Sequence, residues 1–469
     1  MTPSAPIRRK RPGAPPAETA RSLAVAVLTE LDRGRKTLDA MLDEIGDAPG
    51  LPDRRDRDLF NALVFGVLRR RGRLDYILSH FSRLPPEKIE PAVMNILRIA
   101  LFQLAYLTRV PASAAVNTAV DLTKSRSSPR AAAFVNAVLR KAAAGHARLT
   151  FPDADRDPVQ SLAAAHSLPE WLAERWLTRY GKEDATALCE AINAIPPLTL
   201  RTNTLKTTPA ELIQSLRGKA EAVTAAPVAP EGVQVQGLHL KLTELAAFHD
   251  GWFQVQDEAA QLVSLLLAPR AGETILDLCA GRGGKTGHIA QLMGNRGAIT
   301  AADSHPGRLA QLAAEMGRLG VAIAATEAWD ASGPIAPMRA GRFDRVLLDA
   351  PCSGLGTLGR NPDIRWSASQ RELRALAGLQ TRLLETAASC LKPGGVLVYS
   401  VCSPEPEETE AVVAAFLARH REFSIEARPH DQPACLKPLI GPKGCLQTYP
   451  HLRYMDGFFA VRLKRRTRM

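Results

Sequence analysis

At 469 residues the chain is too long for one ordinary hydrophobic core, and its length favours two or three domains. Hydrophobic residues make up 46% and charged residues 23%, a balance typical of globular proteins, and no apolar stretch approaches the ~20 residues of a membrane-spanning helix. The formal net charge of +12 favours a polyanionic partner such as nucleic acid, because each phosphate that a cation neutralises releases a counterion.

The amino-terminal segment, residues 1–16, is basic and rich in proline, and we expect a disordered tail. It lacks the apolar core of a secretory signal peptide, so we expect a cytoplasmic protein. The seven cysteines are an odd number with no framework spacing, and disulfides are not expected in that compartment. No cysteine or histidine cluster has zinc spacing, so we expect no metal.

Apolar residues recur at helical spacing between residues 17 and 145. The segment Glu90–Leu107 carries one apolar stripe, and Pro111 separates it from two further predicted helices, Ser113–Thr123 and Ala131–Ala143. This pattern predicts an all-α bundle. The basic run Arg69–Arg73 in the same region strengthens the expectation of an RNA partner.

Residues 153–251 are predicted to form a small α+β subdomain that connects two larger domains. Leu168–Asn193 has helical periodicity, and Pro196–Asn203 is typical of a strand. A helix is predicted over Thr208–Leu216, with proline in its first turn. Short strands are predicted at Val233–Val235 and Leu238–Leu242.

Strands and helices alternate in the carboxy-terminal region, residues 252–469, which predicts an α/β, Rossmann-like domain with a doubly wound, mainly parallel sheet. The predicted strands are Thr274–Leu278, Ala298–Ala302, Ala322–Ala325, Arg345–Asp349, Val396–Ser400 and Gly457–Leu463. The predicted helices are Gly287–Met293, Pro306–Leu319, Ser369–Cys390 and Glu407–Arg419.

A glycine-rich turn, Asp277–Thr286, follows the first of these strands. Its three glycines let the backbone pass close to a ligand, and it opens a helix whose N-terminus suits a carboxylate or phosphate. The next strand leads to Asp303, an acid placed to accept hydrogen bonds from ribose hydroxyls. The pattern fits a site for S-adenosylmethionine or a dinucleotide.

Two cysteines, Cys352 and Cys402, stand directly after two other predicted strands, the first within the turn Asp349-Ala350-Pro351-Cys352. Ligands of open α/β sheets bind beyond the carboxyl ends of the strands, so we expect both thiols to face one crevice. A single cysteine is usually a small buried hydrophobe, but two at strand ends in polar turns fit that interpretation poorly. The remaining five cysteines are interpreted as buried hydrophobes: Cys189, Cys279, Cys390, Cys435 and Cys445.

A pair of thiols beside a cofactor turn suits the alkylation of an unreactive ring carbon. Carbon 5 of cytosine is too weakly nucleophilic to take a methyl group, but a thiolate that adds to carbon 6 makes it enamine-like. Lys285 and the helix N-terminus at Gly284 favour the thiolate, and Asp349 is placed to hydrogen-bond the ring. Either thiol can attack by this reasoning, and the other can help resolve the adduct.

Several motifs together resemble the Sun (Fmu) family of RNA cytosine-5 methyltransferases. They comprise the glycine-rich turn and the segments Pro196–Asn203, Val255–Ala259, Asp349–Gly354, Asn361–Trp366, Leu391–Gly395, Tyr399–Ser403 and Asp456–Phe459. The helical region resembles the RNA-binding NusB family through Leu97–Tyr106, Val110-Pro111, Ala114–Asn117 and Phe134–Arg140. With such a domain in front, the chain resembles family members that methylate small-subunit ribosomal RNA.

The resemblance implies S-adenosyl-L-methionine as cofactor and 16S ribosomal RNA as substrate. The oligomeric state stays open from the sequence, with a monomer as the default. It implies that Cys402 is the nucleophile and that Cys352 assists product release, with Asp349 and Lys285 completing the catalytic set. The implied cofactor contacts are Cys279, Ala280, Gly281, Arg282, Gly283, Gly284, Lys285, Asp303, Asp330 and Asp349.

The chain departs from the family pattern at two places. Gly281-Arg282 stands where the family usually has Ala-Pro, so Arg282 adds a charge near the cofactor or the RNA. Val401 stands where threonine is common before the nucleophile, so that hydroxyl is not essential in an active enzyme.

Two other functions stay open from the sequence. A methyltransferase acting on an exocyclic amine uses an Asn/Asp-Pro-Pro-aromatic turn and no thiol, whereas the turn here is Asp-Ala-Pro-Cys. An RNA-binding or antitermination factor with a degenerate methyltransferase fold is disfavoured by the intact thiols and by Asp349 and Lys285. A titration of cofactor binding separates these classes.

Overall fold

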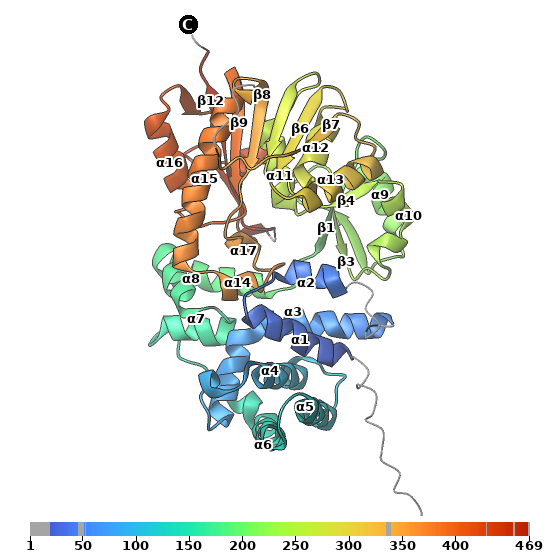
Figure 1. Ribbon diagram of the computed structural model, residues 1–469, viewed down its shortest axis with the longest axis vertical. Helices are drawn as coiled ribbons and strands as arrows, with labels where there is room; N and C mark the ends of the chain where they lie inside the picture. The colour runs from blue at the N-terminus through green and yellow to red at the C-terminus, as the bar shows by residue number, and fades with distance from the viewer. Residues whose placement is uncertain are drawn as a thin grey trace, which may run out of the picture. The chain divides into compact units, whose positions relative to one another are not determined.

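The computed structural model of the chain describes residues 19–45, 51, 53–333, 339–427, 429–453 and 455–467. The expected basic tail, residues 1–16, lies outside these ranges. The chain divides into two compact units, Met1–Cys189 and Glu190–Met469 (Figure 1). Within the described ranges, no helix is both long and apolar enough to cross a bilayer.

The first unit is helical, as the apolar periodicity predicts. The central helix is α4, which packs against α1, α3, α5 and α6 and buries every residue from Val93 to Gln103. Side chains at the N-caps hold the helix starts: the Thr19 hydroxyl accepts from the backbone of Ser22, and the Asp53 carboxylate from that of Asp56. The helices are α1 (Ala20–Asp32), α2 (Leu38–Ile45), α3 (Arg54–Phe81), α4 (Pro91–Tyr106), α5 (Ala112–Arg126), α6 (Pro129–Gly145), α7 (Pro158–His166) and α8 (Glu170–Asn193), which is broken at Gly181 and runs on into the second unit.

The second unit begins with a small sheet in the order β2-β3-β1-β4. Its elements are β1 (Leu198–Thr202), α9 (Pro209–Leu216), β2 (Ala222–Ala225), β3 (Gly232–Gln236), α10 (Ala246–His249) and β4 (Phe253–Val255). Helix α9 begins in a capping box formed by Thr208 and Glu211, as its sequence predicts. The strand predicted at Leu238–Leu242 is wrong: Gly237 turns with φ 60, and a 3-10 helix, Leu242–Glu244, follows. The edge position beside β1 is instead taken by β4.

The large sheet of the second unit has the strand order β10-β12-β9-β8-β5-β6-β7, with β11 paired to β12. Strands β5 to β9 are parallel, and β12 and β10 extend the sheet in antiparallel fashion. The strands are β5 (Thr274–Leu278), β6 (Ala298–Asp303), β7 (Ala324–Ala328), β8 (Phe343–Asp349), β9 (Leu391–Val401), β10 (Phe423–Ile425), β11 (Cys445–Gln447) and β12 (Phe459–Arg465). The predicted doubly wound, mainly parallel sheet is confirmed.

Helices cover both faces of this sheet, so its central strands are apolar on both sides. One face packs against α15 and α16 through residues such as Leu276 and Val346. The other face packs against α11, α12 and α13 through residues such as Ile275 and Leu347. The helices are α11 (Glu258–Leu267), α12 (Gly284–Leu292), α13 (Pro306–Leu319), α14 (Ile364–Ser367), α15 (Gln370–Cys390), α16 (Glu410–Arg419) and α17 (Pro450–Arg453).

The strand order reverses between β5 and β8. From β5 the chain proceeds outward to β6 and β7, then returns to the other side of β5 to form β8 and β9. Such a switch point opens a crevice beyond the carboxyl ends of the adjacent strands. The glycine-rich turn after β5 and the two cysteine turns after β8 and β9 therefore meet at one edge of the sheet.

Candidate active site

The turn between β5 and α12 is shaped by left-handed backbone. Cys279, Gly281 and Gly283 have φ values of 64, 58 and 84. A Cβ at Gly283 would lie 2.7 Å from the Leu312 side chain, so both conformation and space require glycine there. The N–H groups of the first turn of α12 have no partner within the helix and suit an anionic ligand group.

Two predicted cofactor contacts in this turn also have structural roles. The N–H of Ala280 donates to the carbonyl of Ala302 (2.9 Å), which fastens the turn to β6. Burial raises the pKa of Cys279 to about 12, so this thiol stays protonated, in line with its interpretation as a packing residue. Arg282, the departure from the family pattern, is exposed.

Asp303 ends β6 and faces the same turn. Its carboxylate accepts hydrogen bonds from the backbone N–H groups of Gly281 (3.0 Å) and His305 (2.9 Å) and is almost fully buried. A buried acid at a strand end, beside a turn with left-handed backbone, fits the ribose of an adenosyl group. Asp330 follows β7 and is exposed; hydrogen bonds from Ser332 hold its pKa below the usual value.

The two cysteine sulfurs lie together, as the strand ends predict. Cys352 Sγ is 3.2 Å from Cys402 Sγ. Their strands are parallel neighbours, and Asp349 pairs with Ser400 in the register, so the chain delivers both turns to the same point. The Ser400 hydroxyl donates to Asp349 Oδ1 (2.7 Å), which orients the acid just before the Cys352 turn.

Lys285 links the cofactor turn to the cysteine turns. Its Nζ lies 2.5 Å from Asp349 Oδ2, and only 11% of its side chain is exposed. Burial lowers the pKa of Lys285, but the charge of Asp349, with smaller contributions from Cys402 and Asp277, raises it above its usual value. The ammonium therefore stays charged beside the Cys402 sulfur.

The surroundings of Cys352 favour its protonated form. The hydrogen bond with Cys402 and burial, together with the charge of Glu408, raise the pKa of the Cys352 thiol well above its usual value. Cys352 is thus the sulfur that keeps its proton and can donate it to Cys402. The charged groups around the two thiols therefore differ although their sequence contexts look alike.

A buried carboxylate that sequence reasoning missed supports the Cys352 turn. Glu408 accepts hydrogen bonds from the backbone N–H of Ser353 (2.8 Å), from the Ser353 hydroxyl (2.5 Å) and from Gln380 (3.1 Å). The Gln380 amide also donates to the Pro351 carbonyl (3.0 Å). Glu408 follows a proline-rich acidic segment that is typical of exposed loops, so its burial could not be found from its sequence context.

The Asp456–Phe459 motif reaches the site through two glycines. The N–H of Gly356 donates to the carbonyl of Cys402 (3.0 Å), and the N–H of Gly457 donates to the carbonyl of Gly356 (2.8 Å). A Cβ at Gly356 would lie 1.8 Å from the Gly457 oxygen. The two backbone segments can therefore come this close only because residue 356 is glycine. Phe458 follows, and its ring lies 5.3 Å from Lys285 Nζ.

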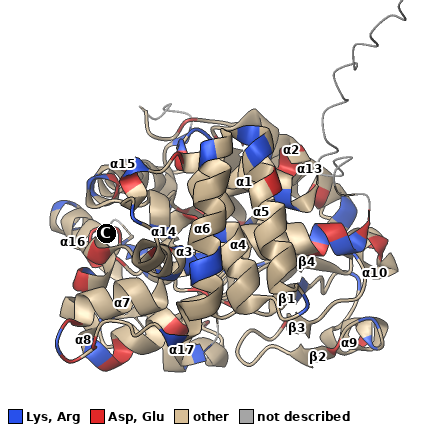
Figure 2. Cartoon of the chain, turned by 90° about the horizontal axis from the view of Figure 1, so that it is seen from below, with Lys and Arg blue, Asp and Glu red and all other residues tan. Residues whose placement is uncertain are grey.

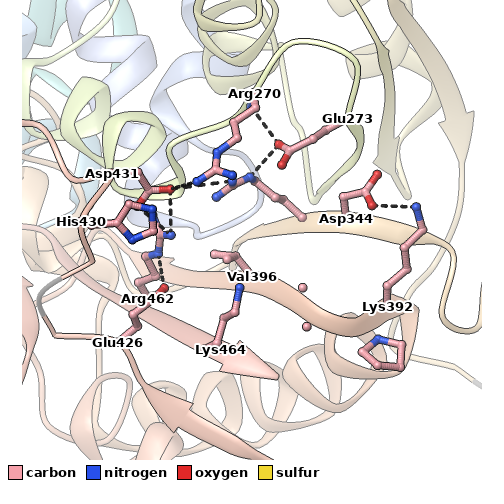
Figure 3. A pocket seen from close by; sticks show the side chains of 14 residues that line it. Arg270, Glu273, Asp344, Lys392, Val396, Glu426, His430, Asp431, Arg462 and Lys464 are labelled. Carbon is pink, nitrogen blue, oxygen red and sulfur yellow. Dashed lines mark hydrogen bonds and ion pairs between the residues drawn. The ribbon is translucent and has the colours of Figure 1, made fainter. Parts of the chain in front are cut away.

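A polar pocket of about 200 Å³ lies at the opposite end of the large sheet (Figure 3). It is lined by the first residues of β8 and β9, including Asp344 and Lys392, and by the end of β12. Ion pairs bridge its walls, among them Arg345 with Glu273 (2.7 Å). The pocket is therefore separate from the thiols, which lie at the carboxyl ends of β8 and β9.

The basic run Arg69–Arg73 is mostly engaged within the helical unit. Arg69 is buried, and burial lowers its pKa to about 10. Arg71 pairs with Asp32 (2.8 Å), and the guanidinium of Arg73 lies 4.2 Å from the centre of the Phe151 ring. Exposed cations lie instead on α6, which carries Arg130, Arg140 and Lys141 and no acidic residue (Figure 2).

The fold and the crevice define the class of an S-adenosylmethionine-dependent methyltransferase. Three family models match: 16S rRNA methyltransferase RsmB/F over residues 264–464, the NusB family over 18–144, and the ferredoxin-like domain of RsmF/B-like methyltransferases over 168–239. The chain belongs to the RsmB/F family of 16S rRNA methyltransferases.

Full-length relatives support this membership. The chain is 38% identical over 449 residues to a probable ribosomal RNA small subunit methyltransferase B of Synechocystis, with 95% of this chain and 99% of the relative covered. It is 35% identical over 458 residues to the corresponding probable enzyme of Bacillus subtilis, with 95% and 98% covered. A solved methyltransferase homologue from Pyrococcus horikoshii has 30% identity and a TM-score of 0.56, covering 66% of this chain and 99% of that one.

The comparisons confirm the predicted architecture of a NusB-like helical domain, a small ferredoxin-like domain and a Rossmann-like methyltransferase domain. S-adenosylmethionine, the predicted cofactor, is the cofactor of the methyltransferase family to which the chain belongs.

Proposed function

We propose that the protein methylates carbon 5 of a cytosine in 16S ribosomal RNA through a covalent adduct with Cys402, acting as a cytoplasmic monomer. The observation that carries this proposal is the pair of sulfurs 3.2 Å apart beside the Lys285–Asp349 ion pair, at the edge of the sheet that carries the cofactor turn. A methyltransferase acting on an exocyclic amine needs no such pair.

Cys402 is the better nucleophile because the buried ammonium of Lys285 lies beside it and attracts its thiolate. The thiolate adds to carbon 6, and the electron pair of the double bond between carbons 5 and 6 moves towards carbon 5 and the rest of the ring. Asp349 is placed to hydrogen-bond the polar edge of the cytosine ring. S-adenosylmethionine supplies an electrophilic methyl group on its sulfonium. Carbon 5, now enamine-like, is nucleophilic enough to accept that methyl.

Cys352 is suited to the second half of the reaction. Its hydrogen bond to Cys402 is the first cause of its raised pKa, and this bond weakens once the Cys402 sulfur is joined to carbon 6. Cys352 can then release its thiol proton to solvent water, and its thiolate takes the proton on carbon 5. The electrons of that C–H bond reform the ring double bond, and the bond between carbon 6 and Cys402 breaks.

The target base must leave its stack to reach the sulfurs, which is cheap in single-stranded or loop RNA. The exposed cations of α6 are suited to phosphate contacts elsewhere on the RNA, because like charges without acidic neighbours attract the backbone. We expect RNA affinity to fall steeply with salt for this reason.

The decisive experiment uses 16S ribosomal RNA whose cytosines carry tritium at carbon 5. Methylation at carbon 5 releases this tritium to water, one atom per methyl group transferred, whereas methylation of the exocyclic amine retains it. Bisulfite mapping of ribosomal RNA from cells with and without the gene then locates the nucleotide. Methyl transfer without tritium release overturns the carbon 5 assignment, and loss of the gene without loss of a 5-methylcytosine overturns the substrate.

A further inference from the structure

A fully buried arginine joins the small sheet to the cofactor turn. Arg201 is the fourth of the five residues of β1 and lies opposite Gln254 of β4 in the antiparallel register. Its guanidinium donates to the carbonyl of Gly284 (2.6 Å), to the Gln254 side chain (2.8 Å) and to the Gln256 side chain. Gly284 belongs to the glycine-rich turn and is the first residue of α12.

This arrangement is expensive for a structural contact alone. All three acceptors are neutral, and among the described residues no carboxylate is hydrogen-bonded to Arg201. Burial lowers the pKa of Arg201 to about 9, although the nearby charges of Glu231 and Glu315 oppose this, so the group stays charged at neutral pH. A buried charge without a hydrogen-bonded counterion costs free energy, and a guanidinium beside a helix N-terminus opposes the helix dipole.

The position of Arg201 beside the first turn of α12 suggests a role that offsets this cost in free energy. The first turn of α12 must hold its N–H groups in position for the methyl donor, and the flexible glycines before it cannot fix that turn by themselves. Arg201 holds the Gly284 carbonyl from the side of the small sheet. Gln256, which holds Arg201, also lies beside Gly284: a Cβ there would be 3.7 Å from the Gln256 amide nitrogen.

We propose that Arg201 is a positioning residue of the methyl-donor site, and that the small ferredoxin-like sheet is therefore part of that site rather than solely a support for RNA. The proposal rests on the cofactor of the family and not on which atom of cytosine is methylated, so its outcome is independent of the tritium experiment.

The test compares two arginines that both bridge the small sheet and the methyltransferase helices. Arg318 of α13 donates to the carbonyls of Phe248 (2.5 Å) and Phe253 (2.9 Å) and pairs with Glu315, and among the described residues none of these hydrogen bonds or ion pairs reaches the cofactor turn. Arg318→Met thus removes a bridge of similar size away from the turn. Arg201→Met leaves buried acceptors unpaired beside the turn, a loss that corresponds to about tenfold or more in affinity.

Calorimetric titration of the full chain with S-adenosylmethionine gives the readout. We expect the Kd of Arg201→Met to rise about tenfold or more, Arg201→Lys to recover part of the loss because it keeps the charge, and Arg318→Met to lower the melting temperature with a Kd within about twofold of the native value. In turnover, the KM for the cofactor should rise more than kcat falls for Arg201→Met.

A milder variant covers the case in which Arg201→Met does not fold. A Cβ at Gly287 would lie 3.1 Å from the Arg201 guanidinium, 3.2 Å from Leu319 and 3.3 Å from the Gln254 oxygen, so Gly287→Ala presses on Arg201 and on its acceptor Gln254 while favouring the helix. We expect a Kd about threefold higher with an unchanged or higher melting temperature. A native Kd in folded Arg201→Met, or in Gly287→Ala if the first variant is lost, overturns the proposal, as does equal weakening by Arg318→Met.

Discussion

Cys352 and Cys402 end neighbouring parallel strands and their sulfurs lie 3.2 Å apart, yet the charges around them differ. The Cys402 sulfur and the carboxylate of Glu408 raise the pKa of Cys352 and so keep its thiol protonated. Cys402 lies beside the buried ammonium of Lys285. Two turns of similar sequence thus differ in their chemistry because side chains from distant segments of the chain surround each thiol differently.

The largest effect expected from this difference is the loss of the nucleophile. Cys402→Ala should abolish methyl transfer to RNA and form no covalent adduct, because the sulfur that interacts with the Lys285 ammonium is gone. Methyl incorporation and denaturing electrophoresis of the RNA–protein mixture measure both quantities. Substantial residual activity in this variant would mean that Cys352 can attack.

The complementary change should stall the reaction rather than prevent it. Cys352→Ala leaves Cys402 beside Lys285, so attack and methyl transfer proceed, but the group that takes the carbon 5 proton is gone. We expect an RNA–protein band that survives denaturing electrophoresis and contains the methyl group. Accumulation of this band in Cys402→Ala instead would reverse the assignment.

The sequence placed the two sulfurs together but could not distinguish them. Their adjacency follows from a general rule about strand ends, which needs only the strand pattern around Val396–Ser400 and Arg345–Asp349. Their difference depends on Glu408 and Lys285, whose side chains reach the sulfurs only after distant elements have packed. The direction of a side chain from α12 or from the segment before α16 is not encoded in a local pattern.

The limits of local sequence patterns also explain which secondary-structure elements were predicted correctly and which were missed. Helix α13 has the predicted bounds, because Pro306 starts it and Gly320 ends it with φ 74. The strands β4, β10 and β11 are three residues long, too short for a periodic signal, and went unassigned. Helix α11 was missed because nearly all of Glu258–Leu267 is buried, which leaves no polar face to mark its period.

The third prediction concerns a variant that removes the charge of Lys285, which distinguishes the surroundings of the two sulfurs. Lys285→Met should lower kcat by about a hundredfold or more, the usual effect of losing a group that assists proton or charge transfer. Lys392→Met is the matched control: it breaks a Lys–Asp pair of similar length, with Asp344 (2.7 Å), at the opposite end of the same strands. Native kcat in Lys285→Met, measured in single turnovers, would remove the ammonium from the thiol chemistry.

The fourth prediction separates the cofactor turn from the cysteine turns. Asp303→Ala should weaken S-adenosylmethionine binding by about 1–3 kcal/mol, the cost of an unpaired hydrogen-bonding group, without changing adduct formation once cofactor is saturating. Asp330→Ala should weaken binding less, because its carboxylate is exposed and its interactions are screened by water. Calorimetry on both variants gives the ranking, and equal losses would show that the two acids contribute alike.

The smallest expected effect is on stability and comes from Asp277, a buried acid at the start of the cofactor turn. Neither cysteine turn has a corresponding residue. Asp277 is fully buried and accepts from the Thr286 hydroxyl (2.6 Å). Burial raises its pKa to about 7, and the charges of Asp349 and Asp303 add to the effect, while the Thr286 hydrogen bond and Lys285 oppose it. In the unfolded chain its pKa is about 3.9, so between these values the folded state holds a proton that the unfolded state has lost.

The sign of the resulting pH dependence follows from linkage. A raised acid contributes stability that is present at low pH and is lost as pH rises toward the folded pKa, here between about 4 and about 7. Asp277→Asn keeps an acceptor for Thr286 and cannot ionise, so its melting temperature relative to the native protein should climb over this range and level off above it. A difference in melting temperature that stays constant from pH 4 to pH 8 would show that Asp277 ionises in the folded protein as easily as in the unfolded chain.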